Sequence, residues 1–204
     1  MRHGRIIGAS APLPPGVRVL IGMGGNIGAS EAIHARFREA LDRLAAALAS
    51  PVARLSAVYG SDPVGPVADQ PRFLNAVAEL VLARGLSARD LLAEILSIEA
   101  SLGRVREETR DQGPRTIDLD LLFAGDWLAS GPGVELPHPR IIERAFVLRP
   151  LAELVGVDWR LPGFGGTVAD YLDSPGLATQ RLGLTLYAPG AATDGEYCRD
   201  AWPR

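Results

Sequence analysis

The order of apolar patterns along the chain constrains its fold more than any other feature of the sequence. Strand-like runs and helical periods alternate through the middle of the 204 residues. The strand-like runs are residues 17–23, 52–59, 75–82 and 117–123. Helical patterns follow the first and the third run, which gives the order βαββαβ. This order predicts an α+β fold, the ferredoxin-like sandwich, in which an antiparallel sheet carries its helices on one face.

Both predicted helices have apolar residues at helical spacing behind a polar start. The first begins at Ser30, an N-cap candidate, and its apolar residues include Ile33 and Phe37. The second begins at Ser87, which with Asp90 resembles a capping box, and it runs to about residue 102.

The two ends of the chain lie outside this alternation. Residues 1–16 are rich in Gly, Pro, Ala and Ser and have no clear period, so we expect a flexible N-terminal extension. Residues 17–155 are expected to form one domain. Residues 156–204 are expected to be a C-terminal extension partly packed on it, with strand character at 182–187. Just before this extension, residues 145–148 indicate a short strand or a helix edge.

Composition argues against several classes of protein. No apolar run approaches the ~18 residues of a membrane span, and residues 1–15 lack the apolar stretch of a secretory signal. The single cysteine, Cys198, cannot form an intrachain disulfide, and no Cys/His cluster has zinc-ligand spacing. A net charge of -3 argues against nucleic-acid binding. We therefore expect a cytoplasmic protein with no membrane or nucleic-acid partner.

Asp118 and Asp120 are the most informative polar pair. Side chains two apart on a strand share a face and lie roughly 7 Å apart. Aspartate is a poor strand former, and two neighbouring carboxylates repel each other unless a cation neutralises them. Mg²⁺ prefers one or two carboxylates, several waters and phosphate oxygens. The pair is a candidate Mg²⁺ site, and a solvated polar sheet face is the alternative.

Four arginines in twelve residues lead into this pair, and they are Arg104, Arg106, Arg110 and Arg115. Guanidinium groups bind phosphate oxygens bidentately and stabilise charge on a transferred phosphoryl group. A solvated loop is the alternative, because every basic residue of this chain is an arginine. Arginines followed directly by carboxylates indicate a polyphosphate bridged by Mg²⁺.

A proline-rich segment, residues 61–71, separates the second and third predicted strands and predicts a long loop, which is often functional. Phe73 and Asn75 follow it, and Phe146 comes after a turn in which His138 lies between two prolines. Aromatic rings and an amide could stack on and hydrogen-bond a flat heterocycle. Ordinary core packing is the alternative for the phenylalanines. For His138, a contact with phosphate or metal and a purely structural role in the turn are equal alternatives.

The segments GPRTIDLDLL (residues 113–122) and DPVGPVADQPRFLN (residues 62–75) together resemble the 6-hydroxymethyl-7,8-dihydropterin pyrophosphokinase family of folate biosynthesis. The resemblance extends over about residues 17–153. It implies the ferredoxin-like fold and transfer of pyrophosphate from ATP to the hydroxymethyl oxygen of the pterin, with release of AMP. It also implies two Mg²⁺ ions held by Asp118 and Asp120. The partners expected are these two small molecules, bound by a monomer.

The resemblance assigns further roles residue by residue. It implies a pterin site made of Ser61, Asp62, Val64, Phe73, Asn75 and Phe146. It implies that ATP is bound by Glu99, Arg106, Arg110, Arg115, His138 and Arg144. The catalytic residues implied are Arg104, Arg115, Asp118 and Asp120. Segments 61–71 and 106–112 are hypothesised to close over the site and exclude water.

Several positions depart from the family pattern. Gln112 stands where the family usually has tryptophan, Gly25 replaces the usual serine, and Gly133 lies where some members carry a phosphate-binding arginine. A non-catalytic or altered-specificity relative that binds a pterin or nucleotide is therefore the alternative function. An RNA-binding ferredoxin-like module is disfavoured because the strands lack the aromatic RNP pattern.

Overall fold

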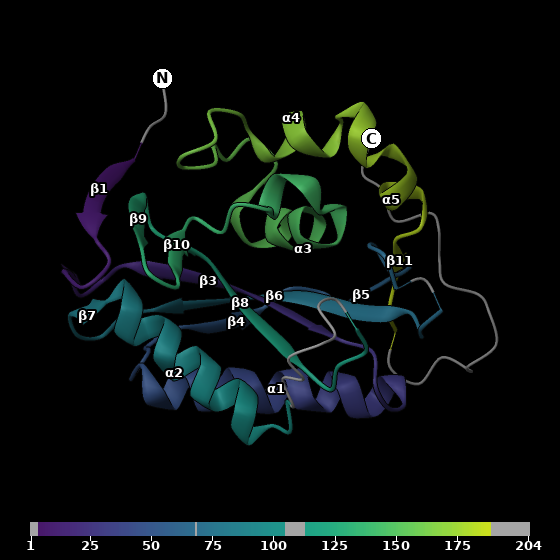
Figure 1. The fold of residues 1–204 in the computed structure, drawn as a ribbon, viewed down its shortest axis with the longest axis horizontal. Helices are drawn as coiled ribbons and strands as arrows, with labels where there is room; N and C mark the ends of the chain where they lie inside the picture. The colour runs from purple at the N-terminus through teal and green to yellow at the C-terminus, as the bar shows by residue number, and fades with distance from the viewer. Residues whose placement is uncertain (1–3, 68, 105–112, 189–204) are drawn as a thin grey trace.

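The computed structural model describes residues 4–67, 69–104 and 113–188. It is a mixed α/β fold in which an antiparallel sheet lies between two layers of helices (Figure 1). The strand order in this sheet is β11-β5-β6-β3-β8, and β4 also pairs with β6. Arg106, Arg110 and the predicted closing segment 106–112 lie outside the described residues.

The three long strands are β3 (Arg18–Gly25), β6 (Phe73–Val81) and β8 (Asp118–Ala124). Strand β3 is central and pairs antiparallel with both of the others. Its apolar residues are buried on both faces, which explains the continuous apolar run in the sequence. These three predicted strands are confirmed, with boundaries that differ by a few residues.

The strand predicted at residues 52–59 is divided into β4 (Ala53–Leu55) and β5 (Tyr59–Ser61). At the break, the Ser56 backbone N–H donates to Val77 O (3.0 Å), while the Ser56 hydroxyl accepts from the Val77 N–H (2.9 Å). The next N–H, of Ala57, donates to the Glu153 carboxylate instead of a strand (2.8 Å). The ladder is interrupted there.

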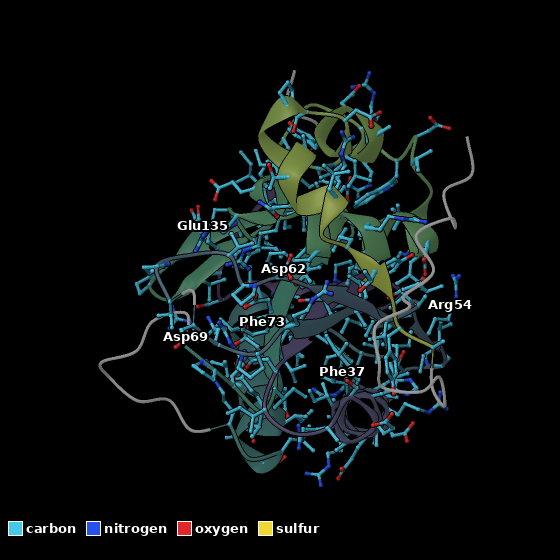
Figure 2. The ribbon with its side chains drawn as sticks, turned by 90° about the vertical axis from the view of Figure 1, so that its right-hand side faces the viewer. Phe37, Arg54, Asp62, Asp69, Phe73 and Glu135 are labelled. Atoms are coloured by element: carbon cyan, nitrogen blue, oxygen red, sulfur yellow. The ribbon has the colours of Figure 1, made fainter. Side chains whose placement is uncertain are left out.

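Helices α1 (Ser30–Ala47) and α2 (Ala88–Ser101) pack on one face of the sheet (Figure 1). Phe37 of α1 is fully buried beneath the strands (Figure 2). Ser87 caps α2 as predicted, because its hydroxyl accepts from the Asp90 N–H (3.1 Å). Ser30 is the first helical residue rather than the cap, since Ala29 holds the N-cap position.

The other face of the sheet is also covered by helices, which corrects the prediction of helices on one face only. Helix α3 (Ala145–Val155) packs there, with the short helices α4 (Val168–Leu172) and α5 (Ala178–Leu182) beyond it (Figure 1). The segment read as a strand or helix edge is thus the start of an 11-residue helix. Pro150 inside that helix hides its pattern in the sequence. None of the helices in the described part of the chain combines the length and apolar character that a membrane crossing requires.

The N-terminal segment, expected to be a flexible extension, contains two short strands. β1 (Arg5–Gly8) pairs in parallel with β9 (Trp127–Gly131), which also pairs with β10 (Val134–Leu136). β2 (Pro12–Leu13) pairs with β7 (Leu86–Ser87). Leu13 is completely buried in the core. Residues 5–13 therefore belong to the fold, and strands this short leave no periodic signal.

Candidate active site

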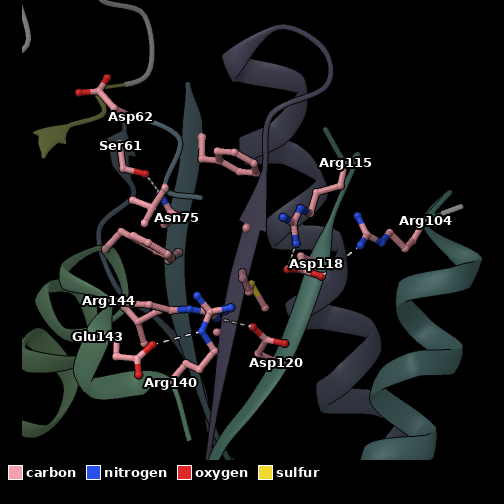
Figure 3. Close-up of a pocket in the computed structure, with 18 residues that line it drawn as sticks. Ser61, Asp62, Asn75, Arg104, Arg115, Asp118, Asp120, Arg140, Glu143 and Arg144 are labelled. Atoms are coloured by element: carbon pink, nitrogen blue, oxygen red, sulfur yellow. Dashed lines mark hydrogen bonds and ion pairs between the residues drawn. The ribbon is translucent and has the colours of Figure 1, made fainter. Parts of the chain in front are cut away.

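A cavity of about 390 Å³ lies where the strands β3, β6 and β8 meet the start of α3 (Figure 3). Most of the predicted site residues surround it. Those that line it are Ser61, Asp62, Val64, Phe73, Asn75, Arg104, Arg115, Asp118, Asp120, Arg144 and Phe146. Segments distant in the sequence are therefore brought together as the resemblance implies.

Two glycines of β3 form part of the cavity lining. Gly24 pairs with Asn75 of β6 on one side and with Asp118 of β8 on the other, and Gly22 pairs with Asp120. A Cβ atom on Gly24 would lie 3.7 Å from the Asn75 Oδ1 and 3.9 Å from the Asp118 Cβ. Because the central strand presents no side chain at these positions, its neighbours can project polar groups into open space.

Asp118 and Asp120 alternate along β8 with the buried residues Leu119 and Leu121, so both carboxylates are on the cavity face, as predicted. Each one meets guanidinium groups (Figure 3). The closest contacts are Arg115 Nη1 to Asp118 Oδ2 at 2.5 Å, Arg104 Nη2 to Asp118 Oδ1 at 3.7 Å, and Arg144 Nη1 to Asp120 Oδ2 at 3.2 Å.

This donor set fits Mg²⁺ better than a metal that needs a full protein cage. Two carboxylates share one face of a strand and open onto a cavity. Within the described residues, no three His, Cys, Asp or Glu side chains come together as a metal-binding group. Mg²⁺ commonly takes one or two carboxylates and completes its octahedron with water and substrate phosphate oxygens. The arginines around the pair suit those phosphates.

Opposite the carboxylates, the cavity has an amide and two aromatic rings. The Asn75 amide nitrogen donates to Ser61 Oγ (2.9 Å) and to Tyr59 O (3.3 Å), which fixes the orientation of this buried side chain. The Arg115 guanidinium lies 5.3 Å from the ring centroid of Phe73. The Arg144 guanidinium lies 5.9 Å from that of Phe146. The predicted heterocycle residues thus lie next to the predicted phosphate residues.

Asn26 connects the two loops of the site, a role that its sequence position did not indicate. Its buried Oδ1 accepts from the Arg115 N–H (2.8 Å). Its Nδ2 donates to Gln70 Oε1 (3.1 Å) and to Pro71 O (3.0 Å). The sequence favours an ordinary strand-to-helix turn here. The structure shows that the turn also joins the loop before β8 to the proline-rich loop.

The preceding residue, Gly25, is one of the departures from the family pattern. A Cβ atom at this position would lie 2.7 Å from the Thr116 carbonyl oxygen, closer than real Cβ contacts allow. The backbone before β8 approaches this turn too closely for any larger residue. Serine at this position would require residues around Thr116 to shift.

Glu99 and His138 do not line the cavity, and their predicted contacts with ATP stay predictions. Glu99 is buried, and its Oε2 accepts from the Leu119 N–H (2.8 Å). Its Oε1 lies 3.7 Å from Arg104 Nε, so it reaches the cavity through that arginine. The Nδ1 of His138 accepts from the Arg140 N–H (3.1 Å). Burial lowers the pKa of His138, and the nearby Asp120 charge opposes this effect.

Two charged residues that the sequence did not single out also line the cavity. Arg140 is the N-cap of the 3-10 helix η1 (Ile141–Glu143) just before α3, Glu143 is its last residue, and Arg140 Nε lies 3.3 Å from Glu143 Oε2. Arg144 follows this turn in an extended conformation (φ -127°, ψ 96°) and also lines the cavity. The turn that carries them is too short to repeat a pattern, so the sequence offered no periodic signal for either residue.

Sequence comparison identifies similar proteins over most of the chain. The family model described as 7,8-dihydro-6-hydroxymethylpterin-pyrophosphokinase (HPPK) matches residues 20–156. A Pseudomonas aeruginosa protein named 2-amino-4-hydroxy-6-hydroxymethyldihydropteridine pyrophosphokinase is 45% identical over 149 residues, which cover 71% of this chain and 84% of that protein. A Synechocystis protein of the same name is 36% identical over 187 residues, 84% of this chain and 89% of the relative.

Solved structures agree on the fold. A crystal structure of HPPK-DHPS in complex with substrates superposes with a TM-score of 0.59, covering 84% of this chain and 46% of that one. A Plasmodium falciparum HPPK-DHPS structure with pterin and p-hydroxybenzoate gives a TM-score of 0.57 over 85% of this chain and 48% of that chain. Both are only 10% identical in sequence, so they are evidence for the fold alone.

Proposed function

The chain belongs to the 7,8-dihydro-6-hydroxymethylpterin-pyrophosphokinase family, and we propose that it transfers pyrophosphate from ATP to 6-hydroxymethyl-7,8-dihydropterin in folate biosynthesis. The convergence of Arg104, Arg115 and Arg144 on Asp118 and Asp120 carries this proposal. Such a set matches a polyphosphate bridged by divalent cations.

In the reaction, the hydroxymethyl oxygen of the pterin forms a bond to the β-phosphorus of ATP and loses its proton. The bond from that phosphorus to the oxygen bridging the α-phosphate breaks, and AMP leaves with that oxygen. The transferred group needs little covalent chemistry from the protein, so catalysis comes from in-line positioning and stabilisation of charge.

The acceptor end of the cavity suits a flat, polar heterocycle. The rings of Phe73 and Phe146 stack on the two faces of the pterin, and Asn75 bonds to its polar edge. Ser61 holds the Asn75 amide in place (2.9 Å), while Asp62 and Val64 complete this end. The position of these residues beside the arginines supports this arrangement, because the hydroxymethyl group must face the phosphates.

At the ATP end, Asp118 and Asp120 would hold two Mg²⁺ ions, whose chemistry is to neutralise charge on the polyphosphate and to fix its oxygens. Arg104, Arg115 and Arg144 then pair with phosphate oxygens in place of the carboxylates, since bidentate guanidinium–phosphate contacts are strong. Glu99, Arg106, Arg110 and His138 are further ATP residues by resemblance.

We further infer that the central sheet is the ferredoxin-like one. The antiparallel order β5-β6-β3-β8, with α1 and α2 both on one face, supports this. We also infer a cytoplasmic monomer. The lone cysteine is consistent with a reducing compartment.

Incubation of the protein with ATP, Mg²⁺ and 6-hydroxymethyl-7,8-dihydropterin tests the function. We expect AMP and diphosphorylated pterin in equal amounts, and AMP only when the pterin is present. Nucleotide and pterin chromatography measures both products. Binding of the pterin without any AMP would favour the non-catalytic relative, and ADP as the product would contradict pyrophosphoryl transfer.

A further inference from the structure

We propose that the C-terminal segment 178–187 fixes the distance between the two aromatic walls of the pterin site, with Gln180 as its positioning residue. This inference rests on the proposed function, because it takes Phe73 and Phe146 as those walls. The segment lies beyond residue 156, where the family match ends. Three sets of contacts connect it to the site.

The first contact holds the start of α3. No side chain caps this helix locally at Arg144. Instead, Gln180 Oε1 accepts from the Ala145 N–H (3.0 Å), and Gln180 Nε2 donates to Glu143 O (2.9 Å). One side chain thus satisfies two backbone groups that flank Arg144, and one of them belongs to the residue directly before Phe146. The position of the second aromatic wall depends on a residue of the C-terminal segment.

The second contact holds the other wall. Arg72 Nη2 donates to Gly183 O (2.6 Å), and its Nε lies 3.1 Å from Asp62 Oδ1. The segment passes close to Asp62 (Figure 2), and a Cβ atom on Gly183 would lie only 2.9 Å from Asp62 Oδ2. Phe73 follows Arg72 directly, so the same short segment contacts the residue that precedes each of the two aromatic residues.

The third contact anchors the segment to the sheet. Strand β11 (Thr185–Leu186) pairs antiparallel with β5, opposite Gly60 and Tyr59. The Tyr187 N–H donates to Val58 O (2.8 Å). The buried Tyr187 ring packs edge-on against the His34 ring, with 5.6 Å between the two ring centroids. The segment is therefore held by the strand whose end carries Ser61, and it bridges from there to α3.

The spacing of the walls matters because stacking acts over a short range. A ring held between two others needs walls about 7 Å apart, twice the van der Waals contact distance. A gap of 0.5–1 Å already loses roughly a quarter to a half of the contact energy. Replacing Gln180 should therefore weaken pterin binding through Phe146 without any contact between Gln180 and the pterin.

A double-mutant cycle between Gln180 and Phe146 tests this. The dissociation constant of 6-hydroxymethyl-7,8-dihydropterin is measured for wild type, Gln180→Leu, Phe146→Ala and the double variant. We expect Gln180→Leu to weaken binding about five- to tenfold in the wild-type background, as for loss of about one net hydrogen bond. In the Phe146→Ala background its effect should be less than about twofold. Thr179→Ala, an exposed neighbour on α5, should bind as wild type does.

Two outcomes overturn the inference directly. One is wild-type affinity in Gln180→Leu, and the other is an equal loss in both backgrounds. If Gln180→Leu does not fold, Gln180→Glu replaces it in the test, because this variant keeps the acceptor for the Ala145 N–H and loses the donor to Glu143 O. Wild-type pterin affinity in Gln180→Glu overturns the inference. A wild-type chain that binds no pterin, or Phe146→Ala binding as wild type does, contradicts the proposed pterin site itself and the inference with it.

Discussion

Individual side chains of the site follow from their positions on strands. Asp118 and Asp120 project into the cavity because strand side chains alternate, and because Gly22 and Gly24 of the next strand leave that face open. Most predicted site residues were therefore accessible from the sequence. Arg140 and Glu143 were not, since they lie on a short turn without a periodic pattern. The loop-joining role of Asn26 depends on tertiary contacts with residues 70, 71 and 115, which local sequence does not encode.

Replacement of Asn26 by alanine should damage both stability and turnover. It leaves the partly buried Arg115 N–H without its side-chain acceptor, which costs about 1–3 kcal/mol of unfolding free energy. Because the loops carrying Arg115 and Phe73 lose their connection, kcat/KM should also fall. Urea unfolding and steady-state kinetics measure the two effects. Ile27→Ala, at an exposed neighbour, is the control, and equal effects of both variants would refute the role of Asn26.

The imidazole of His138 gives a pH prediction. Burial should hold its pKa below the ordinary 6.5 in the Mg²⁺-free protein, and Asp120→Asn should lower the pKa further by removing a charge that raises it. The unfolded chain then binds this proton more tightly, so stability falls as pH drops below 6.5 towards the folded-state pKa. NMR titration of the ring proton, assigned with His138→Gln, measures the pKa of His138 in the wild type and in Asp120→Asn. A pKa at or above 6.5 would contradict this account.

Elements were predictable where a pattern was long enough to repeat. The helices α1 and α2 have clear periods and the three long strands have long apolar or alternating runs, and all five elements are present in the structure. The short strands β1, β2 and β7 have no more than four residues each, so they leave no period to read. Helix α3 was missed as a helix because Pro150 lies within it, and burial on the second face of the sheet overrides that local preference.

The anchoring of α1 to the sheet gives a prediction at this scale. Phe37→Ala should lower the unfolding free energy by about 3–5 kcal/mol, because it empties a fully buried aromatic position. Arg38→Ala, at an exposed position on the same helix, should change it by less than about 0.5 kcal/mol. Chemical denaturation compares them. A loss below about 1 kcal/mol for Phe37→Ala would show that α1 does not depend on this contact.

The whole molecule is larger than the part that the family model matches. The family match ends at residue 156, yet Leu161, Val168, Leu172 and Leu177 are buried in the cluster that surrounds α3. The sequence predicted a segment partly packed on the domain but did not indicate its helices, because the segment is glycine-rich and these helices span only five residues each. The second helical layer, and with it the position of Arg144 and Phe146, depends on this segment.

A chain ending at residue 156 should therefore fail to fold cooperatively. Loss of four buried aliphatic side chains, at about 1.5–3 kcal/mol each, removes roughly as much free energy as holds a domain together. Thermal unfolding of this chain should show no sharp transition. A chain ending at residue 188 keeps every described contact and should retain one. Cooperative unfolding of the shorter chain near the wild-type temperature would contradict this view.

The most direct test of the central claim is the rate of AMP formation in single turnovers with ATP, Mg²⁺ and the pterin, measured for carboxylate variants. Asp118→Asn and Asp120→Asn should each lower the rate by at least about 10²–10³-fold, because each removes stabilisation of the transferred group. Asp126→Asn, at an exposed carboxylate just beyond the end of β8, should react as wild type does. A rate within about twofold of wild type in either cavity variant would contradict the assignment of this site.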